Sequence, residues 1–230
     1  TDYPQVSAIL TDSLCRDFTY LHPEVMDERC TVKNGKLLLQ NNINREQYDI
    51  VIVPGMKTIA WSHVQKLKKF RAQGGTVIFT SQLPVRAVEP GKMEQVGKGI
   101  RQLFDWNGKK EGKTVFIQQP TSTALLAALD ESERLPDITF SADNELRYIH
   151  KRIGGTDLYY FANLRPNDCT TEIRLRGKIM PLALDPHTGS HFEPTYRYEQ
   201  TPSGTPVTVI TIAVKGKHSF FISDRKLFSL

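Results

Sequence analysis

A Pro-Gly turn and a serine are the residues of this sequence whose types and positions come closest to a catalytic arrangement. Pro54 and Gly55 directly follow the apolar run "DIVIV", and Ser81 directly follows a second apolar run, "TVIFT". In α/β proteins, ligands and catalytic groups usually lie in the loops at the carboxyl ends of buried strands. A serine in such a loop is a nucleophile for hydrolysis when a neighbouring base takes its proton. A hydrolase that uses Ser81 is therefore one hypothesis.

Two features of the sequence argue against an active serine. Neither Phe79 nor Leu83 is the glycine that a sharp nucleophile elbow needs. After Ser81, the next histidine in the chain is His150, which lies in a part with a different strand pattern. We therefore interpret Pro54, Gly55 and Ser81 as candidates for a vestigial site on a catalytically inactive scaffold.

A second group of residues has side chains that bind metal ions. Asp185, His187 and His191 lie close together in "DPHTGSH". The pattern Asp-Pro-x-x-Gly is also typical of a hairpin turn that ends in a left-handed glycine, and two histidines beside a flexible glycine do not fix a tetrahedral geometry. We favour the turn for this reason, and His22, His63 and His218 are isolated in the sequence. We predict no catalytic residue, no metal ligand and no cofactor in this chain.

Tyrosines in the last third of the chain are candidates for contact with sugars. Strand alternation in "TDLYYFANL" puts Tyr159 and Phe161 on one face and Tyr160 on the other. Exposed aromatic rings can stack on sugar rings, whereas buried ones belong to a core. We name Tyr160, Tyr196 and Tyr198 as candidates for sugar contact, with a core position as the alternative for each.

The elements expected to position the first group alternate between strands and helices. Asn34-Gly35 lies between two extended stretches and predicts a hairpin. The alternation predicts an open, mostly parallel sheet over residues 1–140. Because the first predicted element is a helix and not a strand, we expect the chain to begin inside a domain. The predicted helices are 1–14, one that begins at Pro23, 58–72, 92–106 and 121–132, and the predicted strands are 18–21, 49–53, 76–80 and 113–117.

Beyond residue 140 the hydrophobic period changes to two. Short alternating runs such as "TTEIRLRG" and "VTVITIAV" are separated by turn residues at roughly ten-residue spacing. This pattern predicts an all-β sandwich domain over residues 141–230.

The charge and the hydrophobic pattern of the chain limit the classes of molecule that we expect it to bind. The net charge is +5, and 12 Lys or Arg against 7 Asp or Glu lie from Leu146 onward. Such an excess could attract polyanionic glycans, but no basic run interleaves with aromatic residues as nucleic-acid platforms require. No apolar run approaches the ~20 residues of a membrane-spanning helix. We therefore expect neither a nucleic acid nor a membrane as partner.

Three cysteines form no metal motif, and a Cys15–Cys30 disulfide is an open alternative for an exported chain.

Several segments together resemble a known family. The strand that ends in Pro54-Gly55 and leads into a helix is similar to the oxyanion loop of class I glutamine amidotransferase-like domains. This resemblance implies that the sheet of residues 1–140 is flavodoxin-like or amidotransferase-like and that the domain is degenerate. That segment, then "DLYYFAN" and "DPHTG" in this order, resembles the carboxyl-terminal region of large bacterial glycoside hydrolases similar to the family-106 α-L-rhamnosidases. The chain departs from the family at residues 182–184, where an aromatic residue often precedes the Asp-Pro.

The resemblance implies a role without catalysis. In that family the catalytic carboxylates and a calcium-dependent substrate site belong to an upstream (β/α)8 barrel, so no catalytic residue is carried over to this chain. It implies an accessory, structural portion of an exported enzyme, periplasmic or extracellular, that acts on plant-type polysaccharides. The expected partners are the upstream catalytic domain and, if the β-rich half is a carbohydrate-binding module, a polysaccharide.

Overall fold

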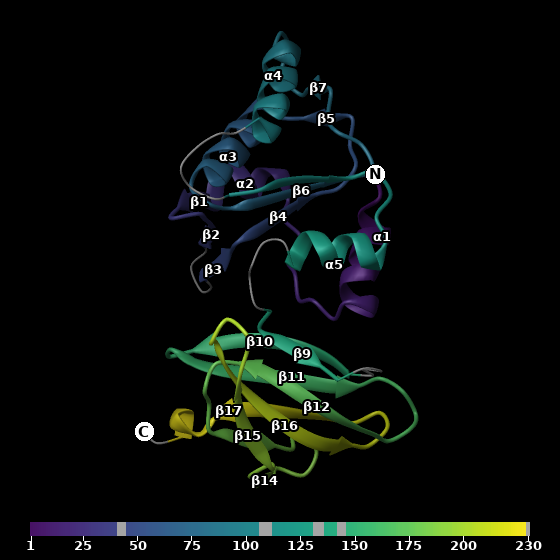
Figure 1. Cartoon of the computed structure of the whole chain (residues 1–230), viewed down its shortest axis with the longest axis vertical. Coiled ribbons are helices and arrows are strands. Elements are labelled where there is room, and N and C mark those ends of the chain that lie inside the picture. Colours follow the sequence, from purple (N-terminus) through teal and green to yellow (C-terminus); the bar gives the residue numbers. More distant parts are fainter. Residues whose placement is uncertain (41–44, 106–111, 131–135, 142–145, 229–230) are drawn as a thin grey trace. The chain divides into compact units, whose positions relative to one another are not determined.

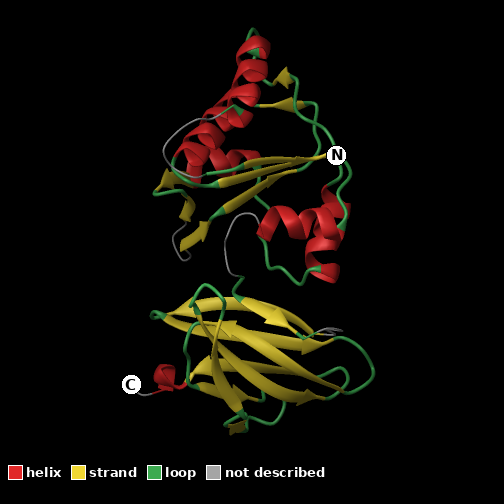
Figure 2. Cartoon of the chain, in the orientation of Figure 1, coloured by secondary structure: helices red, strands yellow, loops and turns green. Residues whose placement is uncertain are grey.

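The computed structural model describes residues 1–40, 45–105, 112–130, 136–141 and 146–228 of the chain. The chain divides into two compact units. The first comprises Thr1–Leu14 and Phe18–Arg134, and the second comprises Cys15–Asp17 and Leu135–Leu230. Together they form a mixed α/β protein with several open sheets (Figure 2).

A parallel sheet in the order β4-β6-β8 is the centre of the first unit (Figure 1). Its strands are β4 (Ile50–Val53), β6 (Thr76–Thr80) and β8 (Thr114–Ile117). All residues of β6 are buried, as expected for the middle strand of a sheet that is covered on both faces. The parallel pairing that the apolar runs predict is confirmed.

Helices pack on both faces of this sheet. Val77 and Phe79 of β6 belong to one hydrophobic cluster with α3 and α4, whereas Ile78 belongs to another with α1, η1 and α5. Successive residues of a strand point to opposite faces, so β6 contributes to both clusters. The helices are α1 (Tyr3–Ala8), its π-helical continuation η1 (Ile9–Ser13), α2 (Pro23–Arg29), α3 (Trp61–Ala72), α4 (Met93–Phe104) and α5 (Ser122–Asp130).

The start of α3 differs from the prediction. The predicted helix at 58–72 begins only at Trp61, because Thr58–Ile59 forms β5, which pairs with β7 (Arg86–Ala87). This pairing brings Glu89 to the helix, where its carboxylate accepts the Trp61 N–H at 2.9 Å. That hydrogen bond lowers the pKa of Glu89. A carboxylate at a helix N-terminus is favourable because it meets unpaired N–H groups and the positive end of the helix dipole.

An antiparallel sheet, β1 (Cys30–Lys33), β2 (Lys36–Gln40) and β3 (Arg45–Tyr48), completes the first unit. The predicted hairpin is confirmed, with Asn34 and Gly35 at φ 52° and 73°. The predicted strand at 18–21 is wrong, because this segment has no regular structure. The segment is a connection whose apolar side chains pack on the core. Phe18 packs against the cluster that contains α5 residues, and Leu21 packs against the cluster that contains α3 residues.

The second unit contains two antiparallel sheets. One has the order β10-β11-β17-β13-β14 and the other β15-β16-β12-β9. The predicted alternation is confirmed, since Tyr159 and Phe161 are buried and Tyr160, between them, is only half-buried. The strands are β9 (Ile138–Phe140), β10 (Leu146–Ile153), β11 (Thr156–Asn163), β12 (Cys169–Arg176), β13 (Pro181–Leu184), β14 (His191–Phe192), β15 (Tyr196–Gln200), β16 (Pro206–Val214) and β17 (Ser219–Asp224).

One hydrophobic cluster joins the two sheets of the second unit. It contains Phe161 and Ile222 of the five-stranded sheet together with Ile173 and Ile210 of the four-stranded sheet. β9, which lies before residue 141, pairs with β12 in this unit. Each sheet therefore directs one apolar face into a shared core.

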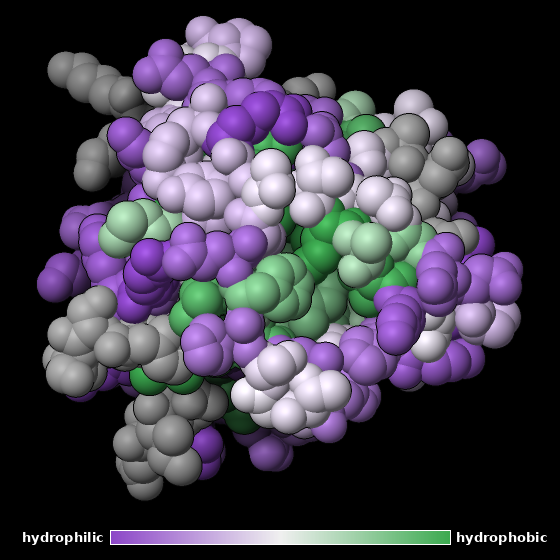
Figure 3. Space-filling model, turned by 90° about the horizontal axis from the view of Figure 1, so that it is seen from below, coloured by the Kyte–Doolittle hydropathy of each residue, from purple (hydrophilic) through white to green (hydrophobic). Residues whose placement is uncertain are grey.

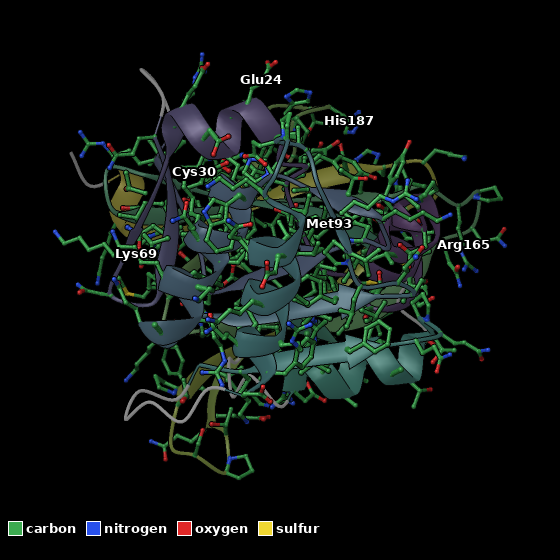
Figure 4. All side chains as sticks on the ribbon, turned by 90° about the horizontal axis from the view of Figure 1, so that it is seen from above. Glu24, Cys30, Lys69, Met93, Arg165 and His187 are labelled. Carbon is green, nitrogen blue, oxygen red and sulfur yellow. The ribbon has the colours of Figure 1, made fainter. Side chains whose placement is uncertain are left out.

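Cys30 is a buried free thiol (Figure 4), so the disulfide with Cys15 is not formed in this structure. Among the residues that the structure describes, no helix combines the length and the apolar character needed to cross a membrane. The predicted ends of two helices, at 105–106 and 131–132, fall partly or wholly outside the described residues.

Candidate functional site

The structure brings Gly55 and Ser81 together at one edge of the parallel sheet. Gly55 follows β4 and Ser81 directly follows β6, and β4 and β6 are parallel neighbours. A Cβ atom placed on Gly55 would lie 3.0 Å from the Ser81 Cβ. Ser81 has φ 53°, a left-handed conformation that is uncommon for a residue with a side chain. The loop therefore has the sharp backbone of an elbow although the flanking glycines are missing.

The Asp2 carboxylate connects the two loops. Its Oδ2 accepts a hydrogen bond from the Ser81 hydroxyl at 2.5 Å, and its Oδ1 accepts one from the Gly55 N–H at 2.6 Å. Asp2 is the residue before α1, and its side chain makes no capping hydrogen bond to that helix. The carboxylate is directed to the edge of the sheet instead.

The N–H groups that could bind an oxyanion at this edge already have acceptors within the chain. The Gly55 N–H donates to Asp2, the Ser81 N–H donates to the Ile117 carbonyl at 2.8 Å, and the Gln82 N–H donates to the Thr80 carbonyl. In serine hydrolases such donors must point at the position where negative charge develops. Pro54, which is half-buried, has no N–H to offer.

The electrostatics of Asp2 also oppose catalysis. Burial raises the pKa of the Asp2 carboxyl, but hydrogen bonds to it, first of all the one from Ser81, outweigh burial and lower the pKa below 3.8. A carboxylate whose pKa is lowered is a weaker acceptor for the proton of a serine hydroxyl. The arrangement is therefore a hydrogen-bonded clamp between the N-terminal segment and two loops. Sequence reasoning missed Asp2, because an aspartate before a proline-containing helix start is typical of a helix cap.

The tyrosine candidates fall into two groups. Tyr160 is half-buried on β11, with its ring centroid 5.0 Å from that of Phe221. Tyr196 and Tyr198 lie on β15, at the edge of the other sheet, and are 38% and 41% exposed. Their ring centroids are 5.4 Å apart with planes at 69°, so the two rings do not form one flat platform. The structure thus brings Tyr196 and Tyr198 together and leaves Tyr160 in a different sheet.

Basic residues near β15 are paired with acids. Arg197 contacts Glu172 at 2.7 Å and Glu199 at 2.8 Å, and Arg174 also contacts Glu199. These exposed pairs reduce the local positive field that a polyanionic glycan would meet.

The turn predicted for "DPHTG" is present between β13 and β14. The Asp185 side chain accepts the His187 N–H at 2.8 Å, and Gly189 has φ 73°. His191 is exposed on β14 and lies outside the group that Asp185 and His187 form with His218.

Two solved structures of glycosidases contain a similar fold. The rhamnosidase from Novosphingobium sp. PP1Y superposes with a TM-score of 0.71 at 18% identity, over 90% of this chain and 19% of that chain. A catalytic mutant of Gan42B, a GH42 β-galactosidase from G. stearothermophilus, superposes with a TM-score of 0.50 at 11% identity, over 77% of this chain and 32% of that chain. The chain therefore spans about a fifth of the length of the rhamnosidase and about a third of the galactosidase.

Sequence comparison identifies the family. No curated protein matches the chain. The family model for α-L-rhamnosidase, glycoside hydrolase family 106, matches residues 12–198. Because this match covers most of the chain, the protein belongs to glycoside hydrolase family 106.

Proposed function

We propose that this chain is a non-catalytic, structural portion of an exported glycoside hydrolase of the α-L-rhamnosidase type, acting on plant-type polysaccharides. One observation carries the proposal: Asp2 binds both the Ser81 hydroxyl and the Gly55 N–H, at the position where an acyl-transfer enzyme would need them free. Stabilisation of an oxyanion by prealigned donors is usually the largest catalytic term, so a site whose donors are already bound loses it.

We further propose that the first unit is a degenerate amidotransferase-like, flavodoxin-like domain and the second a β-sandwich. The parallel sheet with helices on both faces supports the first assignment, and the core shared by two antiparallel sheets supports the second. The partner is then the catalytic domain of the same protein, which holds the catalytic carboxylates and any calcium ion. Export, to the periplasm or the extracellular space, rests on the family resemblance.

Assays of the purified chain test the absence of catalysis. We expect no turnover of aryl rhamnosides, aryl galactosides or glutamine above the buffer rate, and no change in the Ser81→Ala or Asp2→Asn variants. Turnover that survives purification and disappears in Ser81→Ala would show instead that Ser81 is a nucleophile.

A carbohydrate-binding role for the second unit is the alternative. Its support is the exposed pair Tyr196 and Tyr198, with the Lys178 ammonium 4.7 Å from the Tyr198 ring centroid. The second unit also presents a hydrophobic area bordered by hydrophilic residues (Figure 3), and its exposed apolar residues include Met180 and Phe192.

Calorimetric titration with oligosaccharides of acidic pectic glycans separates the two roles. A binding module should give heat that is lost in Tyr196→Ala and Tyr198→Ala but kept in Tyr20→Ala, a change at an exposed tyrosine of the first unit. If millimolar oligosaccharide gives no heat, the binding role is refuted and only the structural role remains.

A further inference from the structure

Three side chains of types that can bind a metal ion, Asp185, His187 and His218, come together in the second unit. Asp185 and His187 lie in the β13–β14 turn, and His218 directly precedes β17. One ligand atom from each residue lies within 4.8 Å of the others. The His218 Nε2 is 3.5 Å from the Asp185 Oδ2, and the two imidazole rings are stacked with centroids 4.0 Å apart. Thus His218, which lies 33 positions after Asp185, adds a third member to a group in which the turn supplies two.

We propose that Asp185, His187 and His218 bind a divalent transition-metal ion, for which Zn²⁺ is the matching chemistry. Two imidazoles and one carboxylate are nitrogen and oxygen donors of the kind that Zn²⁺ takes, whereas Ca²⁺ and Mg²⁺ select oxygen ligands. Three protein ligands leave one tetrahedral position for water.

The turn holds the aspartate ready for a metal ion. The Asp185 Oδ1 accepts the His187 N–H at 2.8 Å, which leaves Oδ2 on the side of His218. Backbone hydrogen bonds fix the turn itself, from the Asp185 N–H to the Ser190 carbonyl and from the Gly189 N–H to the Asp185 carbonyl, both at 2.9 Å. The carboxylate therefore needs little reorganisation to bind.

Both histidines are also held by neighbours. The His218 carbonyl accepts the Asn163 N–H at 2.9 Å, which anchors its backbone to β11. The His187 Nε2 lies 3.0 Å from the Ser219 hydroxyl and accepts the Ser219 N–H at 3.3 Å. Because an N–H donates to it, Nε2 carries the lone pair of the neutral ring, and it is the nitrogen that can bind an ion once the side chain rotates away from Ser219.

Binding requires a small contraction of the group. With bonds of about 2.0–2.1 Å, tetrahedral ligand atoms lie roughly 3.4 Å apart. The ligand atoms lie within 4.8 Å of one another, so no separation needs to close by more than about 1.4 Å. Because His187 is exposed (Figure 4), rotation of its side chain can provide this movement without repacking the core. The bound ion would tie the β13–β14 turn to the start of β17.

Calorimetric titration of the full, untagged and metal-free chain with Zn²⁺ tests the site. We expect one equivalent to bind at micromolar concentration, and Co²⁺ to give the visible absorption of a tetrahedral nitrogen and oxygen site. His187→Ala and His218→Ala should each weaken binding by at least about tenfold. His191→Ala, a change at an exposed histidine of the same hairpin, is the matched control and should bind as the parent chain does.

The Asp185→Asn variant distinguishes the loss of a metal ligand from misfolding of the turn. An asparagine keeps an oxygen that can accept the His187 N–H, so the turn should persist, whereas the anionic ligand is lost. We expect at least about tenfold weaker Zn²⁺ binding with an unchanged circular dichroism spectrum. Absence of binding at 100-fold excess of Zn²⁺, or equal losses in His218→Ala and His191→Ala, would overturn the proposal. Neither result bears on the proposed structural function, which rests on the first unit.

Discussion

Replacement of His150 by glutamine should destabilise the second unit, because it removes a largely buried charge that two carboxylates neutralise. His150 lies on β10 with its side chain only 12% exposed. Its Nδ1 is 3.0 Å from the Asp137 carboxylate, its Nε2 is 3.0 Å from the Asp157 carboxylate, and its ring stacks on Tyr159 at 4.3 Å. An imidazole that donates from both nitrogens carries a positive charge.

The magnitude follows from the pKa of this histidine. Burial by itself would lower the pKa of His150, but the hydrogen bonds to Asp137 and Asp157, and then the charges of both, raise it from 6.5 to about 9. At about 1.4 kcal/mol per pKa unit, this difference corresponds to a ceiling of about 3 kcal/mol. Because the folded-state pKa is raised, the stabilisation is fully present below pH 6.5 and is lost as the pH rises through about 9. Between pH 7 and 9 the loss is about 2 kcal/mol.

The assay is urea denaturation followed by circular dichroism at several pH values. The free energy of unfolding of the parent chain should fall by about 2 kcal/mol more than that of His150→Gln between pH 7 and 9. His191→Gln, a change at an exposed histidine of the same unit, is the control and should keep the parent profile. At acid pH, the lowered pKa of Asp137 adds a contribution that is present above 3.8 and lost as the pH falls further. Parallel profiles of the parent and His150→Gln between pH 7 and 9 would refute the reasoning.

Three further changes test the packing and the clamp. Asp2→Asn should lower the free energy of unfolding in urea by about 1.5–3 kcal/mol, because it removes the charge from two hydrogen bonds. The pKa of Asp2 is lowered in the folded chain, so the difference between parent and variant should shrink as the pH falls below 3.8. Gly99→Ala should cost about 1–3 kcal/mol in the same assay, because the added methyl group would lie 2.6 Å from a carbon of α3, and an unchanged midpoint would contradict the close helix contact. Gly35→Ala should shift the thermal midpoint further down than Gly154→Ala: both glycines have positive φ, but only at Gly35 would the methyl group meet a backbone oxygen, at 2.6 Å. Equal shifts for the two glycines would show that the backbone conformation alone sets the cost.

Local patterns were sufficient for most elements of the fold. The hairpin at Asn34-Gly35, the buried strand β6 and the alternation of Tyr159 and Phe161 with Tyr160 are all confirmed. Each depends on residues that are adjacent in the chain, such as a turn that needs positive φ or a strand whose side chains alternate between faces. Hydrophobic period is therefore a reliable guide wherever neighbouring residues decide the conformation.

Element boundaries were less predictable, because distant contacts set them. The helix predicted from residue 58 begins at Trp61, since β5 pairs with β7 and Glu89 receives the first helical N–H. The apolar segment at 18–21 lacks a strand partner and packs as a connecting segment. A window of sequence contains the apolar residues of both segments, but not the partner that decides between strand and coil.

The chemistry of the sites depended on the tertiary structure even more. Residue types and spacing placed Gly55 and Ser81 in loops after buried strands and placed Asp185 and His187 in a turn, and both placements follow from local conformation. Asp2 reaches Ser81 across 79 positions of the chain, and His218 reaches Asp185 across 33. Such contacts form only when separate strands and helices pack on a common core, because packing, not sequence distance, decides which side chains share a few ångströms of space.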